Sequence, residues 1–392
     1  MNRQRAFLYV QHLLGIGHLR RTATFANALA ARGLEVTLAS GGVPVAGLRL
    51  DNVRFVQLPP AAAADLTFKS LVDAQGAPVN EEWKSQRREI LLEAWRAADP
   101  QALVIELFPF GRRQMRFELL PLLDAASLRK PRPLVVSSVR DVLGGGQKDP
   151  ARQDEMLAAF DRSFDRVLVH GDPSVIPFSR TFRHADTIGG RLHYTGYIAE
   201  DPLAPQAQEG DSTMGAEVIV SAGGGAVGRR LLETAIRARG LSRLSGIRWR
   251  LLCGVNMPIA ELERLAVTAR VEGGGGIIVE RARADFPRLL ETCAVSVSQA
   301  GYNTMMDILR AGARSVVVPF AGGGETEQTV RARAFAEQRL VDVVTEDELT
   351  PPALAAAVDR ATARPRPTHV KVDLRGAERS AELLAGWIAE RT

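Results

Sequence analysis

The sequence predicts an α/β protein built from two doubly wound domains, each with a parallel sheet between layers of helices. Three observations lead to this prediction. Short apolar, β-branched runs alternate with helical patterns along most of the 392 residues, which is typical of parallel sheets. Each half begins with a strand, a glycine loop and a helix, and a stretch rich in Pro, Gly, Gln and acidic residues separates the halves.

The first half, residues 1–199, begins with an apolar strand at 6–10, a loop at 11–18 and a helix at 19–31. Further strands are expected at 34–39, 102–106, 134–138 and 166–169, and further helices at 83–95, 114–125 and 150–164. Residues 200–215 have no apolar period, and we interpret them as an interdomain linker.

The second half, residues 216–372, has a strand at 217–221, a glycine loop at 223–225 and a helix at 227–239. Further strands are expected at 248–253, 276–280, 295–297, 315–318 and 340–344, and helices at 259–269, 303–310, 326–338 and 352–363. The segment 373–392 contains a final helix at 376–390.

The stretch from 296 to 328 constrains function most. Its polar turn at 298–304 and its glycine loop at 322–324 both follow predicted strands. In open parallel sheets, ligands bind outside the carboxyl ends of the strands, so both loops are expected at one site. The helix start at Asn303 and Thr304 offers unpaired N–H groups and a partial positive charge, which suits a phosphate.

Composition excludes several classes of protein. With 46% hydrophobic and 24% charged residues, the chain is typical of a soluble globular protein. Its net charge of +5 favours anionic ligands or an acidic membrane surface, but it is too small to indicate nucleic-acid binding. Cys253 and Cys293 lack metal-ligand spacing. No run approaches the roughly 18 apolar residues of a membrane span, so we expect a cytoplasmic protein.

Three motifs resemble one enzyme family. The stretches 221–225 and 298–304 and the pair Glu327-Gln328 resemble the nucleotide-sugar domain of family 28 glycosyltransferases. The loop 15–21, with its histidine, resembles the phosphate loop of that group. The stretches 108–113, 169–173 and 195–197 are also similar to bacterial predicted glycosyltransferases. This resemblance implies the GT-B architecture, with two Rossmann-like domains whose sheets face across a cleft and a final helix that packs back on the first domain.

The resemblance assigns the nucleotide-sugar donor to the second domain. Asp307 stands where the family has a glutamate that holds the ribose hydroxyls, and the Glu327-Gln328 pair matches the one that contacts the donor sugar. The nucleobase is framed by backbone groups near Arg281. Donor-binding residues are therefore expected at Gly223, Gly224, Gly225, Arg281, Ser298, Ala300, Gly301, Tyr302, Asn303, Thr304, Asp307, Glu327 and Gln328. A tight turn or a plain helix cap is the alternative interpretation of these residues.

The first domain is expected to bind the acceptor. His18 lies just before a helix, whose positive start favours the neutral imidazole that a general base needs. Packing at a helix start is the alternative. The other acceptor or phosphate candidates are Gly15, Gly17, Arg20, Arg21, Arg112 and Arg113. For the last two, a solvated basic face is the alternative. Asp141 and His170 are weaker candidates, and a satisfied histidine in a turn fits His170.

These interpretations predict an inverting glycosyltransferase that moves a sugar from a UDP-linked donor to an unidentified hydroxyl acceptor. No Asp-x-Asp motif is present, so no metal or other cofactor is expected. Contact with the inner face of a membrane is left open for a lipid-linked acceptor. Three alternatives remain: a nucleotide-sugar hydrolase in which His18 activates water, a non-hydrolysing 2-epimerase, and a nucleotide-sugar-binding regulator without catalysis.

Overall fold

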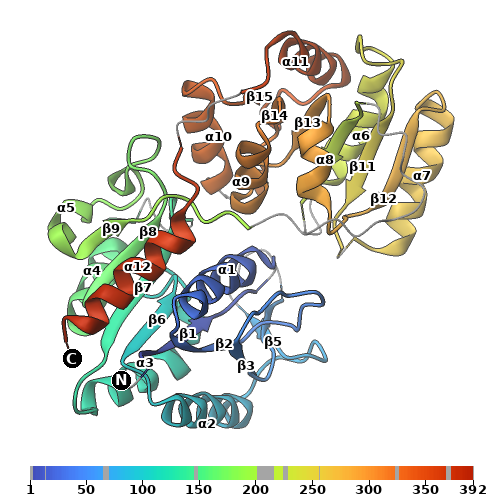
Figure 1. Ribbon diagram of the computed structural model, residues 1–392. Helices are drawn as coiled ribbons and strands as arrows, with labels where there is room; N and C mark the ends of the chain where they lie inside the picture. The colour runs from blue at the N-terminus through green and yellow to red at the C-terminus, as the bar shows by residue number, and fades with distance from the viewer. Residues whose placement is uncertain are drawn as a thin grey trace. The chain divides into compact units, whose positions relative to one another are not determined.

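The structure is a computed structural model. It describes residues 3–13, 15–64, 70–144, 149–200, 216–223, 228–255, 257–322, 326–367 and 372–391. The chain divides into two compact units (Figure 1): unit 1 comprises Met1–Ala199 and Val372–Thr392, and unit 2 comprises Glu200–Lys371. Each unit is a parallel sheet between helices, so the predicted fold class of two doubly wound domains is confirmed.

Among its described residues, unit 1 has a sheet of seven strands in the order β3-β2-β1-β6-β7-β8-β9. They are β1 (Arg5–Val10), β2 (Glu35–Ser40), β3 (Val53–Gln57), β6 (Ala102–Glu106), β7 (Leu134–Arg140), β8 (Arg166–His170) and β9 (Leu192–Tyr194). All neighbours pair in parallel. The strand order reverses between β1 and β6. A separate antiparallel pair joins β4 (Ala62–Ala63) and β5 (Leu71–Val72).

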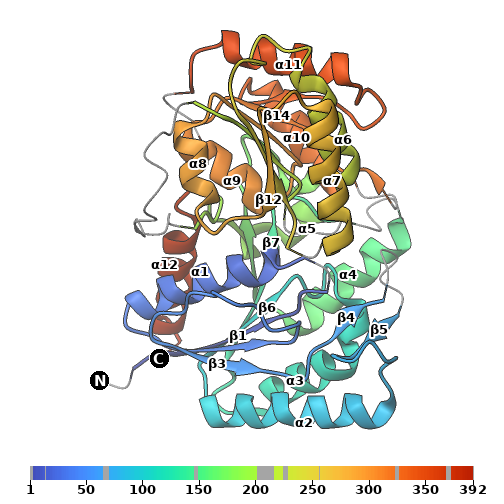
Figure 2. The ribbon, with the colours of Figure 1, turned by 90° about the vertical axis from the view of Figure 1, so that its right-hand side faces the viewer.

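Helices cover both faces of this sheet (Figure 2). α1 (Gly17–Ala31) and α12 (Gly376–Ala389) lie on one face, and α2 (Glu81–Ala98), α3 (Arg116–Leu128) and α4 (Pro150–Ser163) lie on the other; a short helix, α5 (Ala185–Ile188), precedes β9. Side chains of a strand alternate between faces. Phe7 and Tyr9 therefore join the core on the α2 side, and Leu8 and Val10 the core on the α1 side. Burial on both faces explains why β1 is almost continuously apolar.

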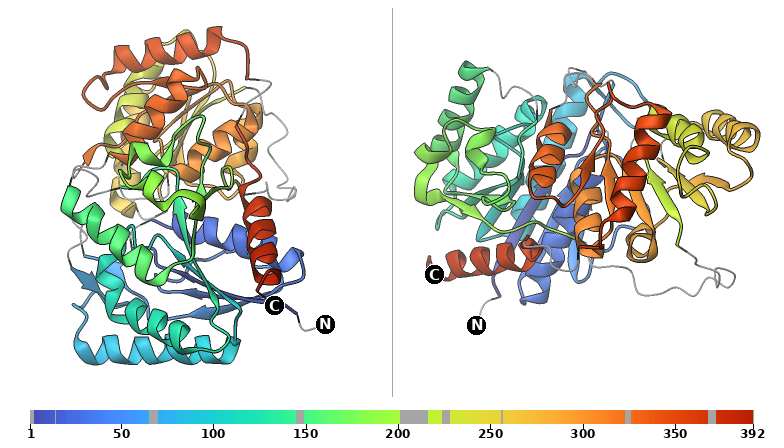
Figure 3. Two further views of the ribbon diagram at one scale, coloured as in Figure 1. Left: turned by 90° about the vertical axis from the view of Figure 1, so that its left-hand side faces the viewer. Right: turned by 90° about the horizontal axis from the view of Figure 1, so that it is seen from above.

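The last helix of the chain, α12, belongs to unit 1 and runs beside α1 (Figure 3). Ala381 and Leu384 are buried in the core that contains α1. The Tyr197 N–H donates to the Asp373 carbonyl at 2.7 Å, and the Gly376 N–H donates to the Tyr197 carbonyl at 2.9 Å. A Cβ at Gly376 would lie 2.5 Å from the Gly196 oxygen. This close approach therefore requires glycine.

Unit 2 has six strands among its described residues, in the order β12-β11-β10-β13-β14-β15. They are β10 (Val218–Ser221), β11 (Trp249–Cys253), β12 (Ile277–Arg281), β13 (Val295–Ser298), β14 (Ser315–Val317) and β15 (Asp342–Val343). All neighbours pair in parallel, with Ser221 opposite Ser298. Here the order reverses between β10 and β13.

Three helices of unit 2 share one core with the sheet: α6 (Arg229–Arg239), α7 (Ile259–Glu272) and α11 (Pro351–Ala363). The opposite face carries α8 (Phe286–Thr292), α9 (Tyr302–Ala311) and α10 (Glu327–Glu337) (Figure 1). Several helix starts differ from the sequence expectation by one or two residues, and two of them lie at candidate site loops. α1 begins at Gly17 rather than residue 19, and α9 begins at Tyr302 rather than residue 303, because the cap residues are Ile16 and Gly301 and neither helix has a side-chain cap.

A buried ion pair connects four segments of unit 1. Arg87 of α2 and Glu118 of α3 are both fully buried, with Nε and Oε2 2.7 Å apart. The same guanidinium donates to the Gly41 carbonyl at 2.8 Å and to Gln11 Oε1 at 2.6 Å. Gln11 and Gly41 directly follow β1 and β2. Arg87 therefore fixes the carboxyl ends of two strands against two helices.

Replacing Arg87 with Met is expected to lower the free energy of unfolding by about 3–5 kcal/mol, because it leaves the Glu118 carboxylate buried without its cation. Urea unfolding followed by far-UV circular dichroism measures this change. The matched control is Arg88→Met on the same helix, where the side chain is 33% exposed; it is expected to change the free energy by less than about 0.5 kcal/mol. Equal effects of the two substitutions would contradict the assignment.

Candidate active site

Each unit has one point where the strand order reverses, and the chain leaves the two central strands there in opposite directions. Loops at such a point border a crevice at the carboxyl edge of the sheet. In unit 1 these are the loops after β1 and β6, and in unit 2 the loops after β10 and β13. Many of the residues expected to bind acceptor and donor lie at these loops, whereas Arg281 ends β12, and Glu327 and Gln328 begin α10 after β14.

His18 lies in the first turn of α1, directly after the β1 loop. Its Nδ1 is 2.6 Å from Oε1 of Glu106, the last residue of β6. Arg21, one turn further along α1, donates to the same oxygen. Glu106 is 1% exposed and His18 is 14% exposed. The reversal between β1 and β6 therefore pairs a partly accessible imidazole with a buried carboxylate.

The surroundings of this pair keep the imidazole neutral. Burial lowers the pKa of His18 to about 3; the Glu106 carboxylate opposes this shift, and the charges of Arg140 and Arg112 add to it. Burial alone would raise the pKa of Glu106, but its bond to His18 and the charges of Arg21 and Arg112 hold that pKa below its usual range. At neutral pH, Nδ1–H therefore donates to Glu106, and Nε2 is left as the basic atom.

Two more polar groups lie near this pair. Arg112 adopts a left-handed conformation with φ 58° at the start of a short 3-10 helix. Its Nε is buried and bonds to no described residue. His12, 4% exposed, follows β1. Its Nε2 lies 3.0 Å from the Val43 carbonyl, and its buried Nδ1 has no partner among the described residues.

The other predicted acceptor residues have different positions. Gly15 is exposed in the β1 loop, Gly17 begins α1 and Arg20 is half-buried on α1. Arg113 is exposed, and its Nη2 lies 3.5 Å from Oε2 of Glu155. Arg21 is 2% exposed and contacts Glu106 rather than solvent.

His170 and Asp141 are both fully buried at the carboxyl ends of β8 and β7. His170 has both ring nitrogens bonded, to Ser138 Oγ at 2.7 Å and to Thr195 Oγ1 at 3.0 Å. This geometry agrees with its interpretation as a satisfied histidine in a turn. Asp141 Oδ1 accepts from the Val142 N–H at 2.9 Å.

In unit 2, the loops after β10 and β13 lie side by side. The Gln299 N–H donates to the Ser221 carbonyl at 3.4 Å. Gly223 has φ +70°, and a Cβ added there would lie 4.0 Å from Gln299 Oε1, so this side of the glycine is open. Ser298 is fully buried, and its Oγ has no partner among the described residues. Gly224 and Gly225, also predicted to bind the donor, lie outside the described residues.

The helix after this turn presents its amino end to the same crevice. Gly301 is the N-cap of α9, and no side chain caps the helix. By contrast, α2, α4 and α11 are capped by Asn80, Asp149 and Thr350. The amino end of a helix also carries a partial positive charge, which suits a phosphate. Tyr302, Asn303, Thr304 and Asp307 lie within α9 itself, with Tyr302 buried and the other three half-buried.

The residues expected at the donor sugar and nucleobase also hold their own loops. Glu327, 5% exposed, accepts from Arg331 at 2.8 Å. Gln328 Oε1 accepts from the Phe320 N–H at 3.1 Å. The Arg281 guanidinium donates to the carbonyls of residues 254, 255 and 257. The Ala300 carbonyl accepts from Arg331 at 3.1 Å.

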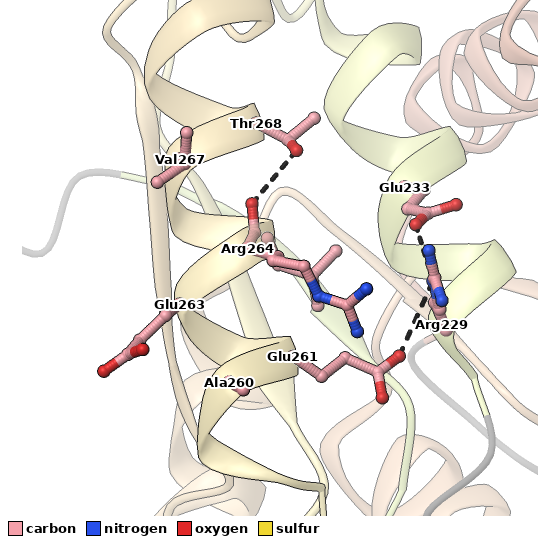
Figure 4. A pocket seen from close by; sticks show the side chains of 9 residues that line it. Arg229, Glu233, Ala260, Glu261, Glu263, Arg264, Val267 and Thr268 are labelled. Atoms are coloured by element: carbon pink, nitrogen blue, oxygen red, sulfur yellow. Dashed lines mark hydrogen bonds and ion pairs between the residues drawn. The ribbon is translucent and has the colours of Figure 1, made fainter.

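A groove between α6 and α7 is a different feature (Figure 4). At the edge of this groove, Nε of Arg229 lies 2.7 Å from Oε1 of Glu233 and 3.6 Å from Oε1 of Glu261. These three charged side chains are therefore paired with one another. The groove lies between two helices, away from the point where the strand order reverses. In the described part of the chain, no three potential metal-ligating side chains come together. No described helix is long and apolar enough to cross a membrane.

Sequence reasoning missed Glu106 and Arg331. Glu106 ends the apolar strand β6 and lies 88 residues from His18 in sequence. The sequence feature that could have identified Glu106 is a carboxylate at the carboxyl end of an apolar strand, where ligands bind in parallel sheets. Arg331 follows Glu327 by one helical turn, a spacing that indicates a paired charge.

Comparisons with known proteins show which families and folds the chain is similar to. Residues 281–373 match the Glycosyltransferase family 28 C-terminal domain. A relative from Geobacillus thermodenitrificans (strain NG80-2) is 25% identical over 190 residues, 47% of this chain and 51% of the relative. Its name is UDP-N-acetylglucosamine--N-acetylmuramyl-(pentapeptide) pyrophosphoryl-undecaprenol N-acetylglucosamine transferase. The chain thus spans about half the length of this curated relative.

Solved structures are similar over the whole chain. The calicheamicin glycosyltransferase CalG4 has a TM-score of 0.60 at 16% identity and covers 100% of this chain and 98% of its own. Acinetobacter baumannii MurG has a TM-score of 0.58 at 14% identity, with coverages of 97% and 99%. The chain therefore has the fold of the GT-B glycosyltransferases. In the C-terminal part of the chain, residues 281–373 are similar to the family 28 C-terminal domain, so the resemblance predicted from the sequence is confirmed.

The depressed pKa of His18 predicts how stability depends on pH. Between about pH 6.5, the ordinary value, and about pH 3, the unfolded chain binds a proton at this residue and the folded chain does not. The free energy of unfolding therefore falls as the pH falls through this window. His18→Gln is expected to flatten the dependence between pH 6 and pH 4 by up to about 1.4 kcal/mol per pH unit. The free energy of unfolding is measured by urea unfolding at each pH for both proteins. If the two plots of this free energy against pH run parallel, the shifted pKa of His18 is contradicted.

Proposed function

We propose that the protein is an inverting glycosyltransferase that moves a sugar from a nucleotide-sugar donor to an acceptor hydroxyl. The observation that carries this proposal is the His18–Glu106 pair, 2.6 Å between Nδ1 and Oε1, at the strand reversal of unit 1. It supplies a neutral imidazole held by a carboxylate, which is the arrangement of a general base. The family 28 match of residues 281–373 supports donor binding in unit 2.

In the proposed reaction, His18 Nε2 takes the proton from the acceptor hydroxyl. The acceptor oxygen then forms a bond to the anomeric carbon of the sugar. The bond from that carbon to the diphosphate breaks, and the nucleoside diphosphate leaves with the electron pair. Glu106 stabilises the imidazolium that forms, through its bond to Nδ1. One displacement of this kind inverts the anomeric carbon.

Negative charge builds on the departing diphosphate. The start of α9 has no side-chain cap and carries the partial positive charge of a helix amino end in unit 2. We propose that this helix start stabilises the leaving group and that the reaction requires no metal. A UDP-linked sugar is the proposed donor, because the curated relative is named for UDP-N-acetylglucosamine.

The acceptor is proposed to bind in unit 1, beside His18 and Arg112. The unpartnered Arg112 Nε suits an anionic group on the acceptor. We propose a cytoplasmic protein that meets the inner membrane face peripherally when its acceptor is lipid-linked.

Substitution of His18 tests the proposed catalytic role. His18→Ala is expected to lower turnover about 10²–10⁴-fold, as losses of a general base usually do, while donor affinity stays unchanged. Glu106→Gln is expected to lower turnover by no more than this, and the double variant to be no slower than His18→Ala, because the two side chains act as a unit. His184→Ala is the control, since that histidine pairs with Asp154 on the surface of unit 1. Full activity of His18→Ala would exclude the mechanism.

A donor panel tests the substrate class. Thermal unfolding is followed with UDP-, dTDP-, GDP- and ADP-sugars, and the UDP-sugar is expected to raise the melting temperature most. A ligand at 100 times its Kd stabilises by about 2.7 kcal/mol. Turnover is expected to survive EDTA. Stoichiometric release of free sugar without any acceptor would replace the transferase with a hydrolase, and no shift with any donor would overturn the proposed function.

A further inference from the structure

Arg331 is a fully buried cation in unit 2, one helical turn after Glu327 on α10. One of its terminal nitrogens donates to Glu327 Oε1 at 2.8 Å. The other donates to the Ala300 carbonyl at 3.1 Å. The guanidinium carbon lies 5.5 Å from the centre of the Tyr302 ring. A single side chain therefore contacts the turn after β13, the first residue of α9 and the first residue of α10.

The shape of the guanidinium matters for these contacts. Its rigid fork reaches two acceptors at once, which the single ammonium of lysine does not reproduce. Glu327 is 5% exposed, so its charge depends on this bond in place of water. The loop that enters α10 is held from the other side, because the Phe320 N–H donates to Gln328 Oε1 at 3.1 Å. The start of α10 is thus fixed relative to the start of α9.

We propose that Arg331 is a positioning residue that sets the sugar half of the donor site against its phosphate half. This inference rests on the proposed function, in which the start of α9 binds the diphosphate and Glu327 and Gln328 contact the sugar. Arg331 itself is buried and touches no ligand. It acts by aiming the Glu327 carboxylate at the sugar hydroxyls. Its loss should therefore weaken the binding of a UDP-sugar more than the binding of UDP, which has no sugar for Glu327 to contact.

The experiment compares the Kd of UDP with the Kd of the UDP-sugar that gives the largest thermal shift. Arg331→Lys is expected to weaken UDP-sugar binding roughly 10-fold or more, the usual effect of losing a hydrogen bond to a charged group, and to change UDP binding less than about twofold. The matched control is Arg333→Lys, an exposed arginine on the same helix, which is expected to leave both constants unchanged. Retained UDP binding also shows that unit 2 is folded.

A double-mutant comparison separates positioning from general support. If Arg331 acts through Glu327, then Arg331→Met/Glu327→Gln binds the UDP-sugar as weakly as Glu327→Gln alone, within about twofold. This double variant leaves no buried charge unpaired, so it serves even where Arg331→Lys does not fold. The positioning role would be overturned if the losses in UDP-sugar affinity of the two single variants multiplied in the double variant. It would also be overturned if Arg331→Lys weakened the binding of UDP and of the UDP-sugar equally. Failure of the unmodified protein to bind any donor would instead overturn the proposed function.

Discussion

The strand order of each unit reverses once, and the placement of both candidate sites follows from this reversal. Parallel strands require crossover helices, and right-handed crossovers on the two sides of a starting strand cover opposite faces of the sheet. The loops after β1 and β6, and after β10 and β13, therefore separate at the carboxyl edge. Glu106 and Ser298, the last residues of β6 and β13, lie at this edge.

Buried charges hold these loops in place. Glu106 lies under His18, Arg87 joins the ends of β1 and β2, and Arg331 joins the starts of α9 and α10. A buried ion pair contributes little net stability compared with an apolar pair, but it has strict geometric requirements. We infer that these pairs fix loop positions rather than raise overall stability. This fits their location beside the two reversals of the strand order.

The sequence predicted the features that depend on local patterns. Alternating strands and helices, the histidine at the start of α1 and the polar turn before α9 all depend on short stretches of sequence. The Glu106–His18 pair joins residues 88 positions apart, and it depends on β1 and β6 being neighbours, which periodicity does not specify. The cap at Gly301 was missed for a related reason. Asn303 and Thr304 resemble caps by residue type, but the helix begins before them, so they lie inside α9.

The two units carry different kinds of chemistry, and this difference explains where the known relatives match. In the proposed function, the helix start of α9 in unit 2 binds the diphosphate whatever sugar it carries. Unit 1 offers side chains, His18, Glu106 and Arg112, whose fit depends on the acceptor. A backbone site tolerates few changes of geometry, whereas side chains vary freely on the same fold. The family 28 match accordingly falls at residues 281–373, within the donor half apart from its last two positions, and the acceptor must be sought from the chemistry around His18.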